Sequence, residues 1–188
     1  MNDARLAVIG TGSIGSIALW NASKMTDGVI GFEAQTPGHT ESAVGGDSRL
    51  FRTSYKDETP YHQMLQDSLE QWRELEQESG QGILHQCGGV YIGHPEENYL
   101  PALLASIKKN GLNHELLSAE EIRTRFPGHG VEDDEQAIFE PDAGFLKTHA
   151  AVSAATNAAT ERGAHIISQG PLDVVTKTSN GVRITSGD

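Results

Sequence analysis

Six residues near the start of the chain, Gly10 to Gly15, form the pattern Gly-x-Gly-x-x-Gly, in which each glycine suits one task in holding a dinucleotide. Gly10 allows a tight turn, Gly12 lets the backbone approach a diphosphate, and Gly15 lets a helix pack closely on a strand. A helix that begins here also presents unpaired amide hydrogens and the positive end of its dipole to phosphate oxygens. The pattern predicts a diphosphate-binding turn; the ordinary alternative is a plain turn between a strand and a helix.

The residues around this turn have the periodicity of a strand, a helix and a second strand. Residues 6–9 form a short apolar run that is typical of a buried parallel strand, and residues 13–25 place small apolar residues at helical spacing. A second strand is predicted at 29–32, although Gly31 weakens its interior. It ends at Glu33, whose carboxylate can accept hydrogen bonds from ribose hydroxyls, which favours FAD or NAD over NADP.

Two guanidinium groups form a second candidate for chemistry. Arg49 and Arg52 lie three positions apart in the segment Gly-Asp-Ser-Arg-Leu-Phe-Arg, residues 46–52, in a chain with few arginines. On a helical turn, this spacing would put the two side chains on neighbouring sides. The ordinary alternative is that both are surface residues in ion pairs.

The elements that position these groups are predicted along the rest of the chain. Residues 34–47 have the composition of a loop, and a long amphipathic helix is predicted at 60–79. Its apolar stripe is expected to pack on a core and consists of Tyr61, Met64, Leu65, Leu69, Trp72 and Leu75. Two short strands are predicted at 83–85 and 90–93, joined across a pair of glycines.

The second half of the chain ends in a pattern that should return to the first sheet. Ser118 and Glu121 form a capping box, and Thr148 is predicted to cap a later helix. A strand after that helix would join the first sheet by a right-handed connection. The predicted elements are a helix at 98–110, a helix that stops before Pro127, strands at 137–139 and 144–146, a helix at 148–162, a strand at 164–168 and a hairpin with strands at 172–176 and 182–185.

Composition excludes several classes of partner. The formal net charge is -12, with 14 basic residues against 26 acidic ones, so a nucleic-acid partner is not expected. The acidic residues 132–135 are interpreted as a solvated loop, and the scattered histidines predict no metal site. The single cysteine, Cys87, is interpreted as a packing residue and favours a reducing compartment. No apolar run is long enough for a signal or a membrane span, so the expected location is the cytoplasm.

Several longer strings resemble the family of monomeric sarcosine oxidase and N-methyltryptophan oxidase, within the D-amino-acid-oxidase-like group of FAD enzymes. Gly-Asp-Ser-Arg-Leu-Phe-Arg and Phe-Glu-Pro-Asp-Ala-Gly are much more particular than the glycine pattern. The resemblance extends over nearly the whole chain, through residues 33–40, 46–52, 55, 88–90, 125–128 and 138–146.

The resemblance implies roles for particular residues. Arg52 would pair with the substrate carboxylate, a task suited to a planar donor with two prongs. Arg49, beside the flavin, would stabilise negative charge on the reduced ring and on the oxygen species. The implied FAD-binding residues are Gly10, Gly12, Ser13, Ile14 and Gly15 at the pyrophosphate, Glu33 with Ala34 at the ribose, Ser48, Arg49 and Leu50 near the isoalloxazine ring, and Leu172 at the adenine.

The predicted fold class is α/β, a Rossmann-like FAD-binding βαβ domain with an inserted mixed α+β portion of a substrate domain. Residues 1–60 and 145–188 are assigned to the FAD-binding portion and residues 61–144 to the insertion. The implied activity is oxidation of the C–N bond of an amino acid or N-methyl amino acid to an imine, with reduction of oxygen to hydrogen peroxide. The partners are a small amine or amino-acid substrate and oxygen, and FAD supplies the redox chemistry.

Two departures from the family pattern change what it implies. Val44 and Gly45 stand where sarcosine-type members carry a pair of histidines, so sarcosine itself is not the expected substrate. The family's chains are also much longer, and the C-terminal half of the family fold is absent from this sequence. We therefore expect an N-terminal fragment that folds weakly and turns over no substrate by itself.

Two other functions stay open. An NAD-dependent dehydrogenase would use the same βαβ unit, although it leaves the later strings unexplained. A non-catalytic nucleotide-binding fragment would bind ADP or FAD without releasing peroxide.

Overall fold

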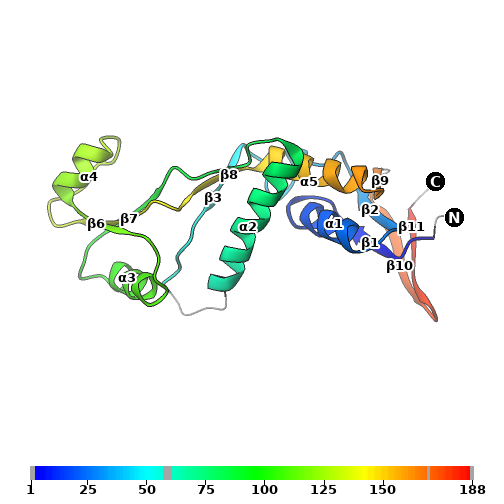
Figure 1. The fold of residues 1–188 in the computed structure, drawn as a ribbon, viewed down its shortest axis with the longest axis horizontal. Helices are drawn as coiled ribbons and strands as arrows, with labels where there is room; N and C mark the ends of the chain where they lie inside the picture. The colour runs from blue at the N-terminus through cyan, green and yellow to red at the C-terminus, as the bar shows by residue number, and fades with distance from the viewer. Residues whose placement is uncertain (1–2, 57–60, 169, 187–188) are drawn as a thin grey trace. The chain divides into compact units, whose positions relative to one another are not determined.

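The computed structural model describes residues 3–56, 61–168 and 170–186, which belong to two compact units (Figure 1). The first unit comprises Met1–Arg49, Glu74–Ile83 and Lys147–Asp188, and the second comprises Leu50–Arg73 and Leu84–Leu146. These boundaries differ from the predicted ones. Residues 74–83 were assigned to the insertion but belong to the first unit, and residues 50–56 were assigned to the FAD-binding portion but belong to the second. The assignment of FAD-binding and substrate portions stays a prediction.

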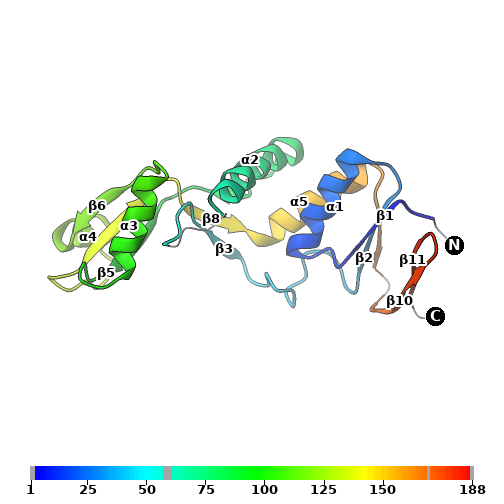
Figure 2. The same ribbon diagram turned by 90° about the horizontal axis from the view of Figure 1, so that it is seen from below.

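A parallel three-stranded sheet with the order β1-β2-β9 forms the centre of the first unit. Helices α1 and α5 pack against each other beside this sheet (Figure 2). The pairing of β2 with both neighbours is parallel, so the predicted βαβ unit and the return of the last helix and strand to the first sheet are confirmed. The elements are β1 (Leu6–Ile9), α1 (Ser13–Met25), β2 (Val29–Glu33), α5 (Thr148–Glu161) and β9 (His165–Ser168).

The sheet of the first unit has one helical face and one face toward a hairpin. The hairpin is antiparallel, as predicted, and consists of β10 (Leu172–Thr178) and β11 (Gly181–Ser186). It shares a hollow of about 630 Å³ with Ala7, Ile30 and Phe32 of the sheet. Val8 and Gly31 alternate with these residues and lie against α1. Successive residues of β1 and β2 therefore serve opposite faces.

The core of the first unit lies between α1 and α5. Leu19 and Trp20 of α1 are fully buried, and so are Ala154, Ala155 and Ala159 of α5. Alanines on the facing surface let the two helix backbones approach while the larger side chains of α1 fill the space between them. The predicted helices at 13–25 and 148–162 are thus buried by each other.

Packing explains why a glycine stands at position 31, although glycine weakens a strand. A Cβ atom at this position would lie 2.8 Å from the Cγ2 of Thr11 and 3.1 Å from the Cδ2 of Leu19. Both distances are shorter than ordinary contacts, so the turn after β1 and the helix α1 occupy the space that a side chain would need.

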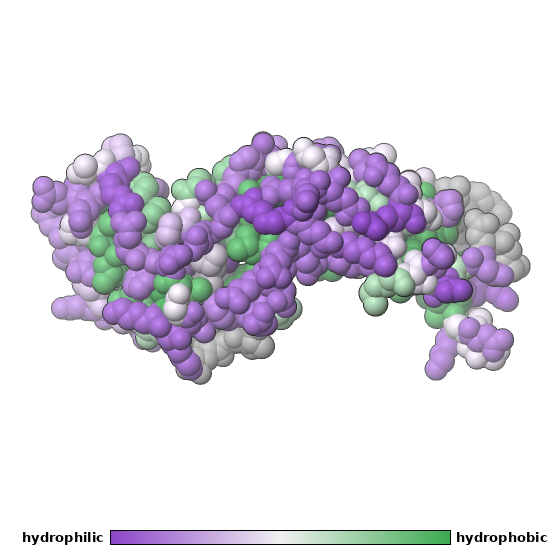
Figure 3. Space-filling model, in the orientation of Figure 1, coloured by the Kyte–Doolittle hydropathy of each residue, from purple (hydrophilic) through white to green (hydrophobic). Residues whose placement is uncertain are grey.

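Two surfaces that were predicted to be buried are partly exposed. Among the described strands β1 pairs with β2 alone, and its Leu6 and Ile9 are 39% and 55% exposed. Helix α2 (Tyr61–Ser79) buries Leu75 completely, but Tyr61 and Met64 of the same stripe are 52% and 59% exposed. The face of the molecule in Figure 3 is mostly hydrophilic, with smaller hydrophobic areas between. The described residues cover neither surface fully.

The second unit is built on two sheets with the orders β3-β8-β4 and β5-β7-β6. Strand β4 pairs with β8, and β5 pairs with β7, so the predicted neighbours at 83–85 and 90–93 belong to different sheets. Residues 48–51 and 115–118 form strands, and no element was predicted at either place. The elements are β3 (Ser48–Phe51), β4 (Leu84–His85), β5 (Gly89–Gly93), α3 (Tyr99–Lys109), β6 (Glu115–Ser118), α4 (Ala119–Arg125), β7 (Gln136–Glu140) and β8 (Gly144–Lys147).

The two predicted helix caps have different outcomes. The capping box of α4 is present, because Ser118 and Glu121 each accept a hydrogen bond from the backbone of the other. Thr148 does not cap α5, since it is the first helical residue and Lys147 takes the cap position without a side-chain bond. The Thr148 hydroxyl instead donates to the carbonyl oxygen of Gly46 at 2.5 Å. It therefore ties α5 to the loop between β2 and β3, which contains Gly46.

Candidate functional site

The three glycines of the turn after β1 meet different surroundings. Gly10 has a φ of 81°, a conformation that favours glycine. A Cβ atom at Gly15 would lie 1.7 Å from the carbonyl oxygen of Gly10, so the approach of α1 to the turn requires glycine. A Cβ atom at Gly12 would meet nothing within 4 Å. The fold explains the first and third glycines, whereas the space beside Gly12 is open.

The beginning of α1 offers backbone donors at this open space. Gly12 occupies the cap position, and no side chain caps the helix. The first turn contains no acidic residue that would compete for its amide hydrogens. Ile14 in that turn is 84% exposed. The positive end of the helix dipole and the amide hydrogens of residues 13–15 are thus available to an anion.

Glu33, at the end of β2, lies directly against the glycine turn. It is 9% exposed, its Oε2 accepts a hydrogen bond from the amide of Thr11 at 2.8 Å, and its Oε1 accepts one from the amide of Ala34 at 2.9 Å. The Nε2 of His39 lies 4.0 Å from Oε1. Backbone amides therefore hold the carboxylate at the carboxyl end of the sheet. Sequence reasoning did not identify Thr11 or His39 as its neighbours, because no spacing rule links them.

Arg49 binds the loop that precedes it. Its guanidinium donates to the carbonyl oxygens of Ser48 at 2.8 Å, Gly45 at 3.0 Å and Ala43 at 3.2 Å. Among the described residues neither Arg49 nor Arg52 forms an ion pair. The described residues therefore do not support the alternative in which both arginines form ion pairs at the surface. Arg49 closes the loop, while Leu50 beside it is 82% exposed.

A small hollow of about 160 Å³ separates this loop from the start of α5. The loop is held there by two contacts with the helix, the bond from Thr148 and a contact of 2.9 Å between the Nδ1 of His149 and the carbonyl oxygen of Gly38. Its lining residues include His39, Thr40, Gly45 and Gly46. The loop that follows Glu33 is thus an ordered part of the first unit.

Arg52 belongs to a group of tyrosines in the second unit. Its Nη2 donates to the hydroxyl of Tyr55 at 3.4 Å, and its guanidinium carbon lies 4.6 Å from the centre of that ring. Partial burial opposes the charge, but the oxygens of Tyr55, Tyr91 and Tyr99 together outweigh it and raise the pKa of Arg52. Tyr61 lies 6.3 Å from Tyr55, and Tyr91 lies 6.4 Å from Tyr99, measured between ring centres. The four tyrosines of the chain thus form two pairs, and Tyr55 of the first pair lies against Arg52. We call these four side chains the tyrosine group.

Of the remaining predicted site residues, Ser48 contacts Arg49 through its carbonyl oxygen, and no described contact brings Leu172 to these groups. Ser48 is exposed at the start of β3, and Leu172 is half-buried at the start of β10. The structure places Arg49 in the first unit and Arg52 in the second. Cys87, interpreted as a packing residue, is exposed.

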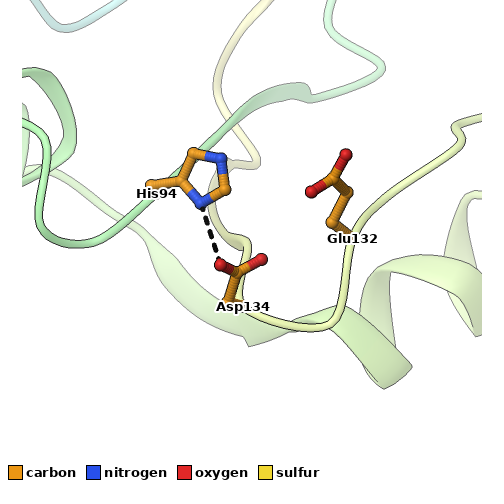
Figure 4. A group of neighbouring side chains, drawn as sticks. All are labelled: His94, Glu132 and Asp134. Carbon is orange, nitrogen blue, oxygen red and sulfur yellow. Dashed lines mark ion pairs between the residues drawn. The ribbon is translucent and has the colours of Figure 1, made fainter.

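One group of possible metal ligands forms in the second unit, although the sequence predicted none. His94, Glu132 and Asp134 point toward one another in Figure 4, and their ligand atoms lie within 4.8 Å of one another. The Nδ1 of His94 lies 3.6 Å from the Oδ2 of Asp134, which is 75% exposed. The acidic loop is solvated as predicted, and it adds an exposed ion pair with His94.

Within the described residues, no helix combines the length and the apolar character needed to cross a bilayer.

Comparisons with known proteins agree with this arrangement. Residues 5–188 match the model of the family described as FAD dependent oxidoreductase. The chain is 33% identical to monomeric sarcosine oxidase of Streptomyces avermitilis over 181 residues, which cover 96% of this chain and 47% of the relative. It is 28% identical to N-methyl-L-tryptophan oxidase of Yersinia pestis over 186 residues, 99% of this chain and 50% of the relative. The chain spans about half the length of the curated relatives it matches.

Solved structures share the fold over nearly the whole chain. NikD, an unusual amino acid oxidase essential for nikkomycin biosynthesis, superposes with a TM-score of 0.81 and 22% identity, covering 95% of this chain and 46% of that one. Glycine oxidase from Bacillus cereus superposes with a TM-score of 0.73 and 19% identity, covering 97% and 53%. The glycine turn, the acid held against it and the family match over residues 5–188 together show that the chain belongs to the FAD-dependent oxidoreductase family.

Proposed function

We propose that the complete protein is an FAD-dependent oxidase of amino acids or N-methyl amino acids. It converts the C–N bond of the substrate to an imine and passes two electrons to oxygen, which takes up two protons and leaves as hydrogen peroxide. The observation that carries this proposal is the open space at Gly12 beside an uncapped helix, with Glu33 held against the same turn.

The glycine turn is the proposed site of the pyrophosphate. The amide hydrogens of Gly12, Ser13, Ile14 and Gly15 would donate to its oxygens, because the start of α1 has no side-chain cap. A Cβ atom at residue 12 would fill the space through which the phosphates approach. FAD, when bound, accepts the two electrons of the substrate.

Glu33 is proposed to hold the ribose of the adenosine. A carboxylate has about four lone-pair sites, and the two short bonds from Thr11 and Ala34 use two of them. Longer bonds from the Thr11 hydroxyl at 3.4 Å and the Gln35 amide at 3.5 Å reach the other two sites, and the ribose hydroxyls would replace them. A phosphate on the 2′ oxygen would be repelled. Ala34 adjoins the ribose in this proposal, and Leu172 contacts the adenine.

On the substrate side, Arg52 is proposed to bind the carboxylate of the amino acid. A planar guanidinium matches a carboxylate with two parallel hydrogen bonds, and an arginine side chain stays charged in proteins. Ser48, Arg49 and Leu50 would lie near the isoalloxazine ring, where the positive charge of Arg49 would stabilise negative charge on the reduced ring and on the oxygen species. The substrate class follows the names of the relatives, and we propose the reducing cytoplasm as the location.

The test uses the complete protein, purified without added cofactor. Its absorption spectrum should show bound oxidised flavin, and it should release peroxide with at least one member of a panel of primary and N-methyl amino acids. Flavin without peroxide would support the non-catalytic alternative. Reduction of NAD in the absence of bound flavin would establish the dehydrogenase alternative and overturn the proposal.

A further inference from the structure

His39, in the loop between β2 and β3, has a side chain that faces the proposed ribose site. Its Nε2 lies 4.0 Å from the Oε1 of Glu33, which is longer than a hydrogen bond. Its Nδ1 is buried and has no hydrogen-bond partner among the described residues. The side chain as a whole is only 18% exposed. The ring thus lies close to a carboxylate while its hydrogen-bonding groups are still available to a ligand.

The loop around His39 is held by backbone contacts on both sides. The amide of His39 donates to the carbonyl oxygen of Thr36 at 3.2 Å, and its carbonyl oxygen accepts from the amide of Ser42 at 3.4 Å. The carbonyl oxygen of the neighbouring Gly38 lies 2.9 Å from the Nδ1 of His149 on α5. These contacts fix the backbone that carries the His39 ring beside the end of β2.

The surroundings of the ring indicate which nitrogen carries the proton. A neutral imidazole has one donor and one acceptor nitrogen. A proton on Nδ1 would be a buried donor without an acceptor in the described structure, whereas a proton on Nε2 faces the carboxylate of Glu33. We therefore assign the proton of neutral His39 to Nε2.

The separation between the two side chains suits one oxygen atom placed between them. An oxygen can lie about 2.8 Å from both Nε2 and Oε1, because these two hydrogen-bond lengths together exceed the 4.0 Å that separates the atoms. A hydroxyl matches this position, since it can donate to the carboxylate and accept from the imidazole. The amide of Gln35 makes only a long bond of 3.5 Å to the same Oε1, which such a hydroxyl would replace.

We propose that His39 is a second ribose-binding residue, which shares one hydroxyl of the adenosine ribose with Glu33. The hydroxyl donates to the Oε1 of Glu33 and accepts a hydrogen bond from the Nε2 of His39. A nucleotide that lacks this hydroxyl leaves both groups without their ligand partner. This inference rests on the proposed function, in which Glu33 holds the ribose of FAD.

The test measures the binding of ADP, which carries the adenosine ribose, to the complete apoprotein. His39→Leu should raise the dissociation constant for ADP by about tenfold, the size expected when one hydrogen bond is lost. The same titrations with 2′-deoxy-ADP and 3′-deoxy-ADP identify the hydroxyl, because the effect of His39→Leu should vanish with one of these two analogues. The dissociation constant for FAD should change in the same direction as that for ADP.

Matched variants separate the donor from general support of the loop. The amide of His39→Gln can reach the position of Nε2 and should recover most of the lost affinity, whereas the shorter amide of His39→Asn should not. His149→Leu changes the loop contact at Gly38, and no described contact joins His149 to Glu33. Any weakening that it causes should be equal for ADP and both deoxy analogues. The midpoint of thermal unfolding shows whether each variant is folded.

The outcomes are distinguishable from a failure of the proposed function. If the wild-type apoprotein binds neither FAD nor ADP, the proposed function fails and takes this inference with it. If it binds both, and His39→Leu leaves the affinity for ADP unchanged or weakens all three nucleotides equally, this inference alone is overturned. A glutamine variant as weak as the leucine variant would overturn it as well. If His39→Leu does not fold, the comparison of the glutamine and asparagine variants decides in the same way.

Discussion

The glycine turn of the first unit and the tyrosine group of the second unit are candidate sites of opposite construction. The turn uses backbone amides from residues that follow one another, with one carboxylate from the next strand. The tyrosine group uses side chains, with the ring of Tyr55 4.6 Å from the guanidinium carbon of Arg52. A site made of backbone depends on steric room, whereas a site made of side chains depends on charge and hydrogen bonding. The two regions should therefore fail in different ways when they are changed.

The largest effect is expected at Gly15. Replacement by alanine puts a Cβ atom 1.7 Å from the carbonyl oxygen of Gly10, an overlap with backbone that no side-chain rotation relieves. We expect Gly15→Ala to prevent stable folding of the first unit. Far-ultraviolet circular dichroism and thermal unfolding of the complete protein measure this. A Gly15→Ala protein with wild-type stability and flavin content would contradict the close packing of α1 on the turn.

Gly12→Ala is the matched control within the same turn. Its Cβ atom meets nothing within 4 Å, and its φ of −72° lies outside the left-handed region that favours glycine, although its ψ of −148° lies just beyond the usual β region. We expect the midpoint of unfolding of the apoprotein to stay near that of the wild type. FAD affinity should fall by about a hundredfold, because the methyl group displaces the phosphates from the amides. Titration of apoprotein with FAD gives the dissociation constant, and unchanged affinity would argue against the proposed pyrophosphate site.

In the second unit, Arg52→Gln tests the contribution of a charge, whereas Gly12→Ala tests the need for steric space. The amide keeps part of the hydrogen-bonding capacity but loses the charge, so KM for an amino acid should rise by several tens of times while FAD content stays unchanged. Steady-state peroxide release and the flavin-to-protein absorbance ratio provide the two readouts. Loss of flavin with no change in KM would contradict the proposal that Arg52 binds the substrate and would indicate that it helps to hold FAD instead.

The smallest expected effect is on the stability of the first unit. Glu78 accepts hydrogen bonds from Trp20 of α1 and from Arg162 after α5, both at 2.9 Å, and thereby ties α2 to both helices. The bond from Arg162 is the main cause of its lowered pKa. Because the folded-state pKa is lowered, the stabilisation is complete above the ordinary value of 4.5 and is lost as the pH falls through the folded-state value.

Glu78→Gln should lower the free energy of unfolding at neutral pH by about 1 kcal/mol, a modest figure because solvent reaches Arg162 and screens the pair. The difference between the variant and the wild type should shrink in acid. Urea unfolding at neutral pH and below pH 4.5 measures both quantities. Equal unfolding free energies at neutral pH would show that the three helices do not depend on this carboxylate.

Local patterns predicted much of the fold. The strands at 6–9 and 29–33, the helices α1, α3 and α5 and the closing hairpin follow from periodicity and turn residues that lie within a few positions of each other. The errors arose where distant contacts decide. No element was predicted at β3, which forms because it joins the sheet of β8 and β4. Thr148 is of a residue type that often caps helices, yet its hydroxyl donates to the carbonyl oxygen of Gly46, 102 positions away in sequence.

The candidate sites divide in the same way. Spacing alone indicated Gly10, Gly12, Gly15 and Glu33, because a phosphate-binding turn is built from consecutive backbone groups and needs glycine at set places. Tertiary structure alone decided that Gly31 makes room for Thr11, and that Tyr91 of β5 meets Glu140 of β7. Sequence spacing encodes what neighbouring backbone can do. Side chains from separate strands acquire a common chemistry only when sheet register brings them together.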